Sequence, residues 1–256
     1  MVIGIQKFKE YFKEFPKQYI IIGGTACDII MEEKNFVPRG TQDIDMILIV
    51  EALSTDFVKQ FWLFIKDAGY ELQQKSADQR IFYRFLKPAN KEFPKQIELF
   101  SRIPDSVNFE GEGNFTPIPV DDELSNLSAI LMDEDYYNYT LQHSIPQQDL
   151  RLANIEALVC LKAKAFINLT EQKEKGEQID AKKIAKHKTD VFRLAAMLAP
   201  NSNFDLPQSI FNDLQAFAGV IKNDLPNKQM FENFGLPNAN AEDILNLLIA
   251  SFIIKQ

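Results

Sequence analysis

Cysteine is scarce in this sequence, and long apolar runs are missing from it. Cys27 and Cys160 are the only cysteines among 256 residues, which is too few for a disulfide framework or a zinc site. The longest apolar stretch, residues 244–254, contains Asn246 and Ser251 and is far shorter than the roughly 20 residues that span a bilayer. We therefore expect no membrane segment.

Positive charge is also in short supply, since 28 basic residues face 36 acidic ones and the formal net charge is −8. An acidic chain is not built for nonspecific binding to nucleic acid, which depends on many Lys and Arg contacts with phosphates. Residues 162–188 are a local exception, with eight lysines and four acids, and fit a solvated face and a basic patch equally well. Residues 1–15 lack the apolar run of a signal peptide, so cytoplasm is the expected compartment.

Apolar spacing divides the chain into two parts. Up to about residue 150 short apolar strands alternate with amphipathic helices, and from residue 154 helical spacing dominates. We predict strands over residues 19–22, 43–50, 70–74, 80–86, 95–101 and 127–132, a loop over 104–119, and helices over 3–15, 25–33, 54–68, 133–142, 155–169, 181–198, 208–222 and 241–254. This order predicts an α+β domain over residues 1–152 and a mainly helical domain over 153–256.

A glycine pair follows the first apolar strand. Gly23 and Gly24 have no side chains, so the backbone can approach a ligand closely at this turn. The helix expected from Thr25 offers free N–H groups and a positive dipole end, which favour a phosphate, and the Thr25 hydroxyl adds a donor. Taken alone, such a turn is more often plain turn geometry than a ligand site.

Two aspartates open the next strand. Asp43 and Asp45 have the same parity, so their carboxylates point to one face, while the rest of the strand is apolar and fit for a central position. Neighbouring carboxylates repel each other unless a cation lies between them. Mg²⁺ prefers carboxylate and phosphate oxygens and often needs few protein ligands. The aspartates and the glycine turn together predict nucleotidyl transfer.

Glu98 is the candidate for a third carboxylate, because it lies between Ile97 and Leu99 in another strand fit for burial. One or two Mg²⁺ ions held by Asp43, Asp45 and Glu98 could activate an attacking hydroxyl and stabilise a pyrophosphate leaving group. The alternative is that Glu98 is an exposed residue of an edge strand.

Two lysines fall in the middle of apolar helical stripes. Lys162 does so on helix 155–169 and Lys188 on helix 181–198, whereas Asp190 lies on the opposite side from Lys188, as a surface or ion-pair residue. Lysines are rarely buried without a partner, so the two indicate a shared anion such as a nucleotide triphosphate. The alternative for each is a packed stem whose ammonium group reaches water.

The two motifs together resemble the polymerase-beta-like nucleotidyltransferase superfamily, and within it the AbiEii-type toxins of bacterial toxin–antitoxin and abortive-infection systems. The likeness rests on Gly23-Gly24-Thr25 followed by Arg39, Thr41, Asp43 and Asp45 in the pattern Arg-x-Thr-x-Asp-Ile-Asp. Residues 127–137, 161–169 and 186–193 also look like segments of that group. The resemblance covers roughly residues 18–195, and the C-terminal helices are not diagnostic.

The resemblance implies a mixed sheet with flanking helices, a helical domain that completes a nucleotide cleft, an NTP substrate and Mg²⁺. By position, Gly23, Gly24 and Thr25 would hold phosphates, and Arg39 would support the loop before the aspartates. Asp43, Asp45 and Glu98 would be catalytic and bind metal. Lys162 and Lys188 would contact nucleotide phosphates. The hydroxyl acceptor could be tRNA, and an antitoxin protein could be a partner.

Two departures from the superfamily pattern affect the metal count. The glycine turn and the aspartate pair are well separated here, and the third carboxylate is glutamate where aspartate is common. Two other functions stay open. One is a nucleotidyltransferase that modifies a small molecule of the antibiotic type, which needs an acidic, concave acceptor pocket. The other is a regulator that binds a nucleotide without turnover.

Overall fold

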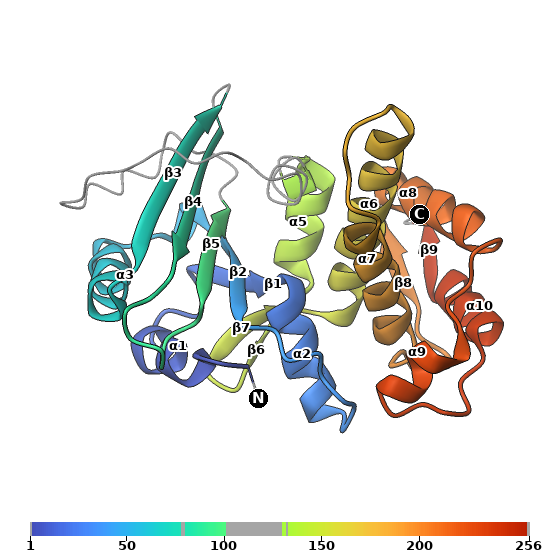
Figure 1. The fold of residues 1–256 in the computed structure, drawn as a ribbon, viewed down its shortest axis with the longest axis horizontal. Coiled ribbons are helices and arrows are strands. Elements are labelled where there is room, and N and C mark those ends of the chain that lie inside the picture. Colours follow the sequence, from blue (N-terminus) through green and yellow to red (C-terminus); the bar gives the residue numbers. More distant parts are fainter. Residues whose placement is uncertain (1, 78–79, 101–129, 132, 255–256) are drawn as a thin grey trace. The chain divides into compact units, whose positions relative to one another are not determined.

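A computed structural model describes residues 2–77, 80–100, 130, 131 and 133–254. The described residues form two compact units (Figure 1). The first comprises residues 2–30, 38–77, 80–100 and 144–153, and the second comprises 31–37, 130, 131, 133–143 and 154–254. The chain therefore passes between the units several times, and each unit is assembled from segments that are distant in the sequence. Among the described residues, no helix is both long and apolar enough to cross a membrane.

The first unit is built on a seven-stranded sheet with the order β3-β4-β5-β2-β1-β7-β6. The strands are β1 (Tyr19–Ile22), β2 (Asp43–Leu48), β3 (Glu71–Ala77), β4 (Arg80–Leu86), β5 (Gln96–Phe100), β6 (Ser144–Gln147) and β7 (Leu150–Ala153). β2 is parallel to β5 and β1 to β7, whereas the other neighbours are antiparallel. The sheet is therefore mixed, as predicted, and β2 lies at its centre (Figure 1).

Aromatic side chains cover one face of this sheet. Helices α1 (Ile5–Phe12) and α3 (Thr55–Ala68) present Phe12 and Phe61, which contact Tyr19 of β1 and Phe85 of β4. Ser54 accepts a hydrogen bond from the Phe57 backbone N–H and so caps the start of α3. Tyr19 and Phe85 pair in register with Leu48 and Ile97, whose parity is opposite to that of Asp45 and Glu98. The acidic residues therefore lie on the other face.

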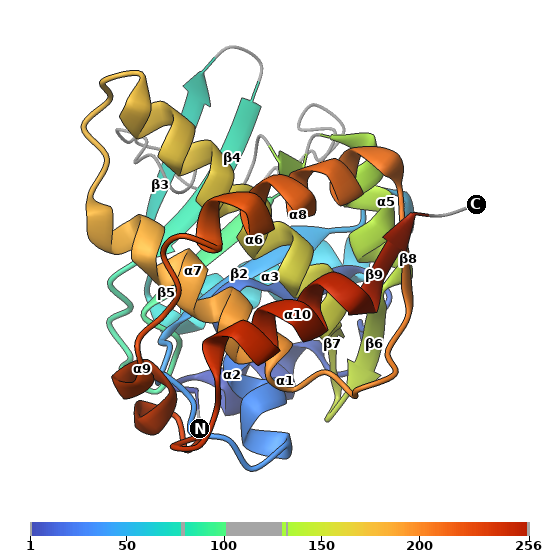
Figure 2. The ribbon, with the colours of Figure 1, turned by 90° about the vertical axis from the view of Figure 1, so that its right-hand side faces the viewer.

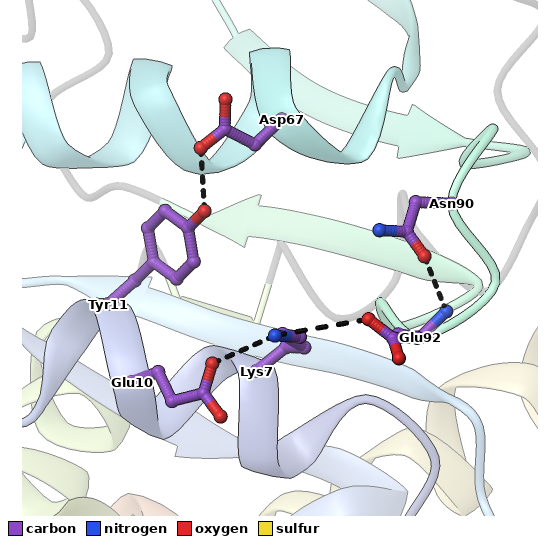
Figure 3. Close-up of polar contacts among 6 residues, drawn as sticks. All are labelled: Lys7, Glu10, Tyr11, Asp67, Asn90 and Glu92. Carbon is purple, nitrogen blue, oxygen red and sulfur yellow. Dashed lines mark hydrogen bonds and ion pairs between the residues drawn. The ribbon is translucent and has the colours of Figure 1, made fainter.

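Polar contacts fasten the outer side of α1 to its neighbours (Figure 3). The Tyr11 hydroxyl donates a hydrogen bond of 2.6 Å to Asp67 of α3. Lys7 Nζ lies 3.0 Å from Glu10 and 3.9 Å from Glu92. Because the ion pairs are exposed, they contribute little to stability compared with the aromatic packing behind them.

The second unit is mainly helical (Figure 2). Its elements are the C-terminal part of α2 (Gly23–Glu33) together with α5 (Glu134–Gln142), α6 (Ile155–Glu174), α7 (Ala181–Ala195), α8 (Gln208–Ile221), α9 (Lys228–Asn233) and α10 (Ala241–Ser251). Strands β8 (Phe204–Leu206) and β9 (Phe252–Ile254) form a small parallel sheet. Helix α6 is buried on most of its surface, which explains why its apolar residues extend around the helix.

Several boundaries differ from the sequence predictions. Helix α2 begins at Gly23, two residues early, and α10 ends at Ser251, because the residues after it pair with β8 as strand β9. The hairpin β6–β7 was not predicted, and its strands are only four residues long. The strand predicted over 127–132 lies mostly outside the described residues, and its two described residues, Ile130 and Leu131, are helical. The loop predicted over 104–119 lies outside them entirely.

Candidate active site

Gly23 brings the acidic strand against the start of helix α2. Its backbone φ is +67°, and a Cβ placed on it would lie 2.0 Å from Oδ2 of Asp45. Both observations require glycine, since other residues adopt this conformation at a cost and have no room for the side chain. The Asp45 carboxylate therefore lies directly beside the first turn of α2, where free N–H groups favour an anion.

Gly24 has a similar role toward the segment that precedes β2. A Cβ at this position would lie 2.8 Å from Oγ1 of Thr41 and 3.1 Å from Nη2 of Arg39. The exposed Arg39 guanidinium therefore lies over the first turn of α2. A cation and a helix N-terminus at one point form a favourable environment for phosphate oxygens.

Asp28 and Thr25 fasten α2 to the same segment. The buried Asp28 carboxylate accepts hydrogen bonds from the backbone N–H groups of Arg39, at 3.0 Å, and Thr41, at 2.7 Å. The Thr25 hydroxyl is fully buried and donates to the carbonyl oxygen of Asp43, at 2.5 Å. The Thr25 proton that was predicted to serve a phosphate is therefore donated to the backbone, where it fixes the start of β2.

Sequence reasoning missed Asp28. The signal was available, because Asp28 is the one charged residue in the apolar run from Ala26 to Met31. A carboxylate in such a run is rarely buried without partners, so it indicates a buried polar contact with a structural or functional role.

Asp45 and Glu98 are neighbours on adjacent central strands. β2 and β5 are parallel, with Asp45 opposite Glu98 and Asp43 opposite Gln96, so these four side chains share one face of the sheet. Glu98 is 7% exposed, and β5 lies between β4 and β2. The alternative interpretation of Glu98, as an exposed residue of an edge strand, is therefore wrong.

Three donors meet at one oxygen of Glu98. Arg84 places Nη2 at 2.5 Å and Nε at 2.6 Å from Oε1, and Gln96 Nε2 lies 2.8 Å from the same atom. Arg84 reaches Glu98 because the two residues are paired in register between β4 and β5. Arg84 was not predicted from the sequence. Its pairing with Glu98 depends on the register between β4 and β5, and that register depends on the length of the connection between the two strands.

Burial raises the pKa of Glu98 well above its ordinary value, and the neighbouring Asp45 raises it further. Arg84 opposes this shift, while a side-chain hydrogen bond with Asp45 adds to it. Two carboxyl groups can share a hydrogen bond only when one of them carries a proton. A shared proton and the Arg84 guanidinium therefore reduce the repulsion between Asp45 and Glu98, and a bound cation could replace the proton.

The donor chemistry of this pair fits Mg²⁺, since Asp43, Asp45 and Glu98 offer only carboxylate oxygens on one face of the sheet. In the part of the chain that the structure describes, however, no three carboxylate, imidazole or thiol side chains are gathered closely enough to hold a metal. Asp45 and Glu98 are thus in place as a pair, and Asp43 is aligned with them without completing a three-ligand group.

The structure provides both predicted phosphate-binding lysines with carboxylate partners. Lys162 Nζ lies 3.2 Å from Oδ2 of Asp190, and the two side chains are 9% and 1% exposed. Lys188 Nζ lies 2.6 Å from Oδ2 of Asp224, which is largely exposed. These contacts do not test nucleotide binding, so the assignment of both lysines to nucleotide phosphates stays a prediction.

The orientation of α7 differs from the one predicted. Asp190 is buried and Lys188 is only half-buried, whereas the helical stripe had Lys188 inward and Asp190 outward. The buried stripe of α7 includes His187, Asp190 and Leu194, because Asp190 turns inward to meet Lys162 of the neighbouring α6. A charged residue with a buried partner cannot be distinguished from a surface residue by hydropathy alone.

No protein-family model matches the sequence, and no curated protein matches it significantly. A solved structure that aligns with the chain is an antigenic nucleotidyltransferase-like protein from Paracoccidioides brasiliensis. The alignment has 14% sequence identity and a TM-score of 0.45, and it covers 98% of this chain and 96% of that one.

Proposed function

We propose that this protein is a Mg²⁺-dependent nucleotidyltransferase that moves a nucleoside monophosphate from an NTP to a hydroxyl acceptor. The observation that carries the proposal is the Asp45–Glu98 carboxyl pair, placed beside Gly23 at the first turn of α2. An acidic pair next to an anion-binding helix end suits a reaction in which phosphate charge is bound at one side and a proton is removed at the other.

The first turn of α2 and Arg39 are proposed to bind the triphosphate. The backbone at Gly23 and Gly24 is open to close approach, and the Arg39 guanidinium lies over the same turn. Asp28 holds the backbone of Arg39 and Thr41, so it would position the guanidinium without touching the nucleotide. Positioning of the α-phosphate next to the carboxyl pair would supply much of the rate enhancement.

In the chemical step, the acceptor oxygen attacks the α-phosphorus, the bond to the bridging oxygen breaks, and pyrophosphate leaves with the bonding electrons. The acceptor hydroxyl proton passes to the Glu98 carboxylate. Glu98 suits this role because it lies beside Asp45 on the face of the sheet that carries the carboxylates. Bound Mg²⁺ held by Asp43, Asp45 and Glu98 would neutralise the charge that develops on the leaving group.

We propose tRNA as the acceptor, in the role of a toxin in a toxin–antitoxin or abortive-infection system, with an antitoxin protein as partner. The resemblance to the AbiEii-type group supports this role. The end of α6, the segment that follows it and the first turns of α7 add support, since Lys173, Lys175, Lys182 and Lys186 are exposed there. Exposed lysines grouped in one segment can bind an RNA backbone even when the whole protein is acidic.

A small-molecule acceptor is the second candidate. The observation in its favour is the formal net charge of −8, since an acidic protein suits an acceptor that carries amino groups better than it suits RNA. An acidic, concave pocket is what an acceptor that carries amino groups would require.

The test is incubation of the full chain with each α-labelled NTP, Mg²⁺ and either total tRNA or a panel of small hydroxyl compounds. Transfer of label to tRNA that is lost in Asp45→Asn and retained in Asp56→Asn, an exposed position of α3, would support the proposal. Transfer to a small compound instead would support the second candidate. Tight NTP binding with no transfer to any acceptor would overturn both and favour a non-catalytic regulator.

A further inference from the structure

A buried arginine of the second unit holds the chain shortly before Arg39. Arg193, in the last turn of α7, is 5% exposed, and its Nη2 atom donates a hydrogen bond of 2.5 Å to the carbonyl oxygen of Val37. The guanidinium also lies over the ring of Phe234, 5.1 Å from the ring centre. An arginine is rarely buried to this extent unless its charge and its donors are used. The contact with Val37 is therefore a specific anchor of the segment that follows α2.

The start of this segment is also fixed within the second unit. Asn35 has a positive φ of +61°, and the Phe36 N–H donates a hydrogen bond of 2.8 Å to the carbonyl oxygen of Met31, which is the arrangement that commonly ends a helix. Val37 then approaches the end of α9, since a Cβ placed on Gly235 would lie 3.8 Å from Cγ2 of Val37. The chain thus leaves α2 in a defined direction, with Val37 held by residues of α7 and of the turn after α9.

Asp28 anchors the next part of the segment within the first unit. Its carboxylate accepts a hydrogen bond of 3.0 Å from the Arg39 backbone N–H. Only Pro38 separates this N–H group from the Val37 carbonyl group that Arg193 holds. The proline ring fixes its own φ at about −65°, and the residue before a proline is restricted to extended conformations. A shift of the Val37 carbonyl is therefore passed on to Arg39, because the link between them is stiff.

We propose that Arg193 is a positioning residue for the triphosphate site. By fixing the course of the chain into Arg39, it holds the Arg39 backbone in place before a nucleotide binds, and so reduces the free-energy cost of binding. The planar guanidinium suits this task better than an ammonium group, since it directs a hydrogen bond along its plane while its face lies over an aromatic ring. This inference rests on the proposed function, because the site that it serves is the proposed triphosphate site.

The first test needs no nucleotide and measures amide hydrogen exchange in the full chain. Arg193→Lys keeps the charge but loses the planar fork. We expect the amides of Arg39 and Thr41, which Asp28 holds, to exchange at least about fivefold faster, with the amides of α8 unchanged. Phe217→Leu, a buried substitution in α8, is the control and should not accelerate those two amides selectively. Equal acceleration of all amides in Arg193→Lys would show a purely structural role and overturn the proposal.

The second test measures NTP kinetics. Arg193→Lys should raise the KM for the NTP about tenfold and change kcat by less than about twofold, because Arg39 is proposed to bind the triphosphate while the carboxyl pair carries the chemistry. In the Arg39→Ala background, Arg193→Lys should cause no further rise in KM, since two residues that act through one contact are not additive. Independent, additive increases in KM would show that Arg193 does not act through Arg39, and would overturn the proposal.

Pro38→Gly provides a variant that removes no hydrogen bond, since proline has no N–H group. It loosens the link between the two anchors, so it should accelerate exchange at Arg39 and raise the KM for the NTP, and unchanged values of both would overturn the proposal even if Arg193→Lys does not fold. If the unsubstituted protein neither binds nor transfers any NTP, the proposed function fails and this inference fails with it. If it transfers nucleotide but Arg193→Lys leaves exchange and KM unchanged, only this inference fails.

Discussion

Two buried groups of charged side chains differ in how their charges balance. In the sheet, the carboxylates of Asp45 and Glu98 lie side by side, the Arg84 guanidinium contacts Glu98, and the pKa of Glu98 is raised. In the helical unit, Lys162 of α6 meets Asp190 of α7 as one cation and one anion. Both groups are largely buried, but the acidic pair in the sheet contains a repulsion that the pair in the helices lacks.

The difference distinguishes a site from a structural contact. Burying like charges side by side is unfavourable unless a ligand or a proton relieves the repulsion, so such pairs are commonly retained for function. A buried pair of opposite charges satisfies itself, and its loss leaves an uncompensated charge. Substitutions in the sheet should therefore affect activity more than stability, and substitutions in the helices should do the reverse.

The largest expected effect is the loss of nucleotidyl transfer when a residue of the acidic pair is substituted. Asp45→Asn should lower nucleotidyl transfer by about 10³-fold, because an electrostatic group at the reacting phosphate is lost. Its free energy of unfolding should stay unchanged or rise, since the repulsion with Glu98 is removed. Transfer assays and urea unfolding check both parts, with Asp56→Asn as control. A variant that loses stability while retaining activity per folded molecule would reverse the comparison.

The next effect concerns the helical pair. Lys162→Met should lower the free energy of unfolding by about 3 kcal/mol, because the buried Asp190 carboxylate would lose the Lys162 ammonium. The double variant with Asp190→Leu should recover most of that loss, since a packed apolar pair avoids the charge altogether. Urea unfolding of the two single variants and the double variant measures the coupling. Additive losses would show that the two side chains are not coupled in the folded protein.

Alanine substitutions at two glycines test how closely Asp45 approaches α2. Gly23→Ala should destabilise the protein by about 2 kcal/mol, because φ is positive and the new Cβ would meet the Asp45 carboxylate. Gly219→Ala, within helix α8 and facing open space, should stabilise it by about 0.5–1 kcal/mol. Thermal unfolding of both variants checks the contrast. Similar shifts in both would mean that the close approach of Asp45 does not exist in solution.

The smallest effect is a pH dependence. The pKa of Glu98 is raised above 4.5, so native protein binds its proton more tightly than unfolded protein does. The free energy of unfolding should therefore fall as pH rises from 4.5 through the native pKa, by at most about 1.4 kcal/mol per pH unit. Glu98→Gln should flatten this slope, and the exposed Glu171→Gln should not. Urea unfolding across this pH range measures the slope for the unsubstituted protein and for both variants. Equal slopes in all three would contradict the prediction.

Much of the fold could be predicted because local signals agree with the final structure. Ser54 and Gly69 mark the ends of α3 through a side-chain cap and a left-handed residue, and the helix predicted over residues 54–68 agrees with α3 to within one residue. The apolar run after Asp45 indicated a central strand, and β2 is central. The strand β9 was missed because its helical spacing continues that of α10, and only pairing with β8 makes it a strand.

The candidate site could be predicted in part, for a similar reason. Parity placed Asp43 and Asp45 on one face, and the apolar neighbours of Glu98 indicated a buried strand. The involvement of Arg84 and Asp28 could not be predicted, since it depends on strand register and on a loop that folds back onto α2. The partner of Lys162 was missed because hydropathy gave Asp190 an outward position.

The alternation of strands and helices, the glycine turn and the three acidic positions could be predicted from sequence, because periodicity and turn chemistry are local properties of the chain. The contacts of Asp45 with Gly23, of Arg84 with Glu98 and of Lys162 with Asp190 appear only in the folded chain. Those outcomes depend on which strands become neighbours and how two helices turn toward each other. Such long-range choices are made by the packing of the whole core, which no short segment encodes.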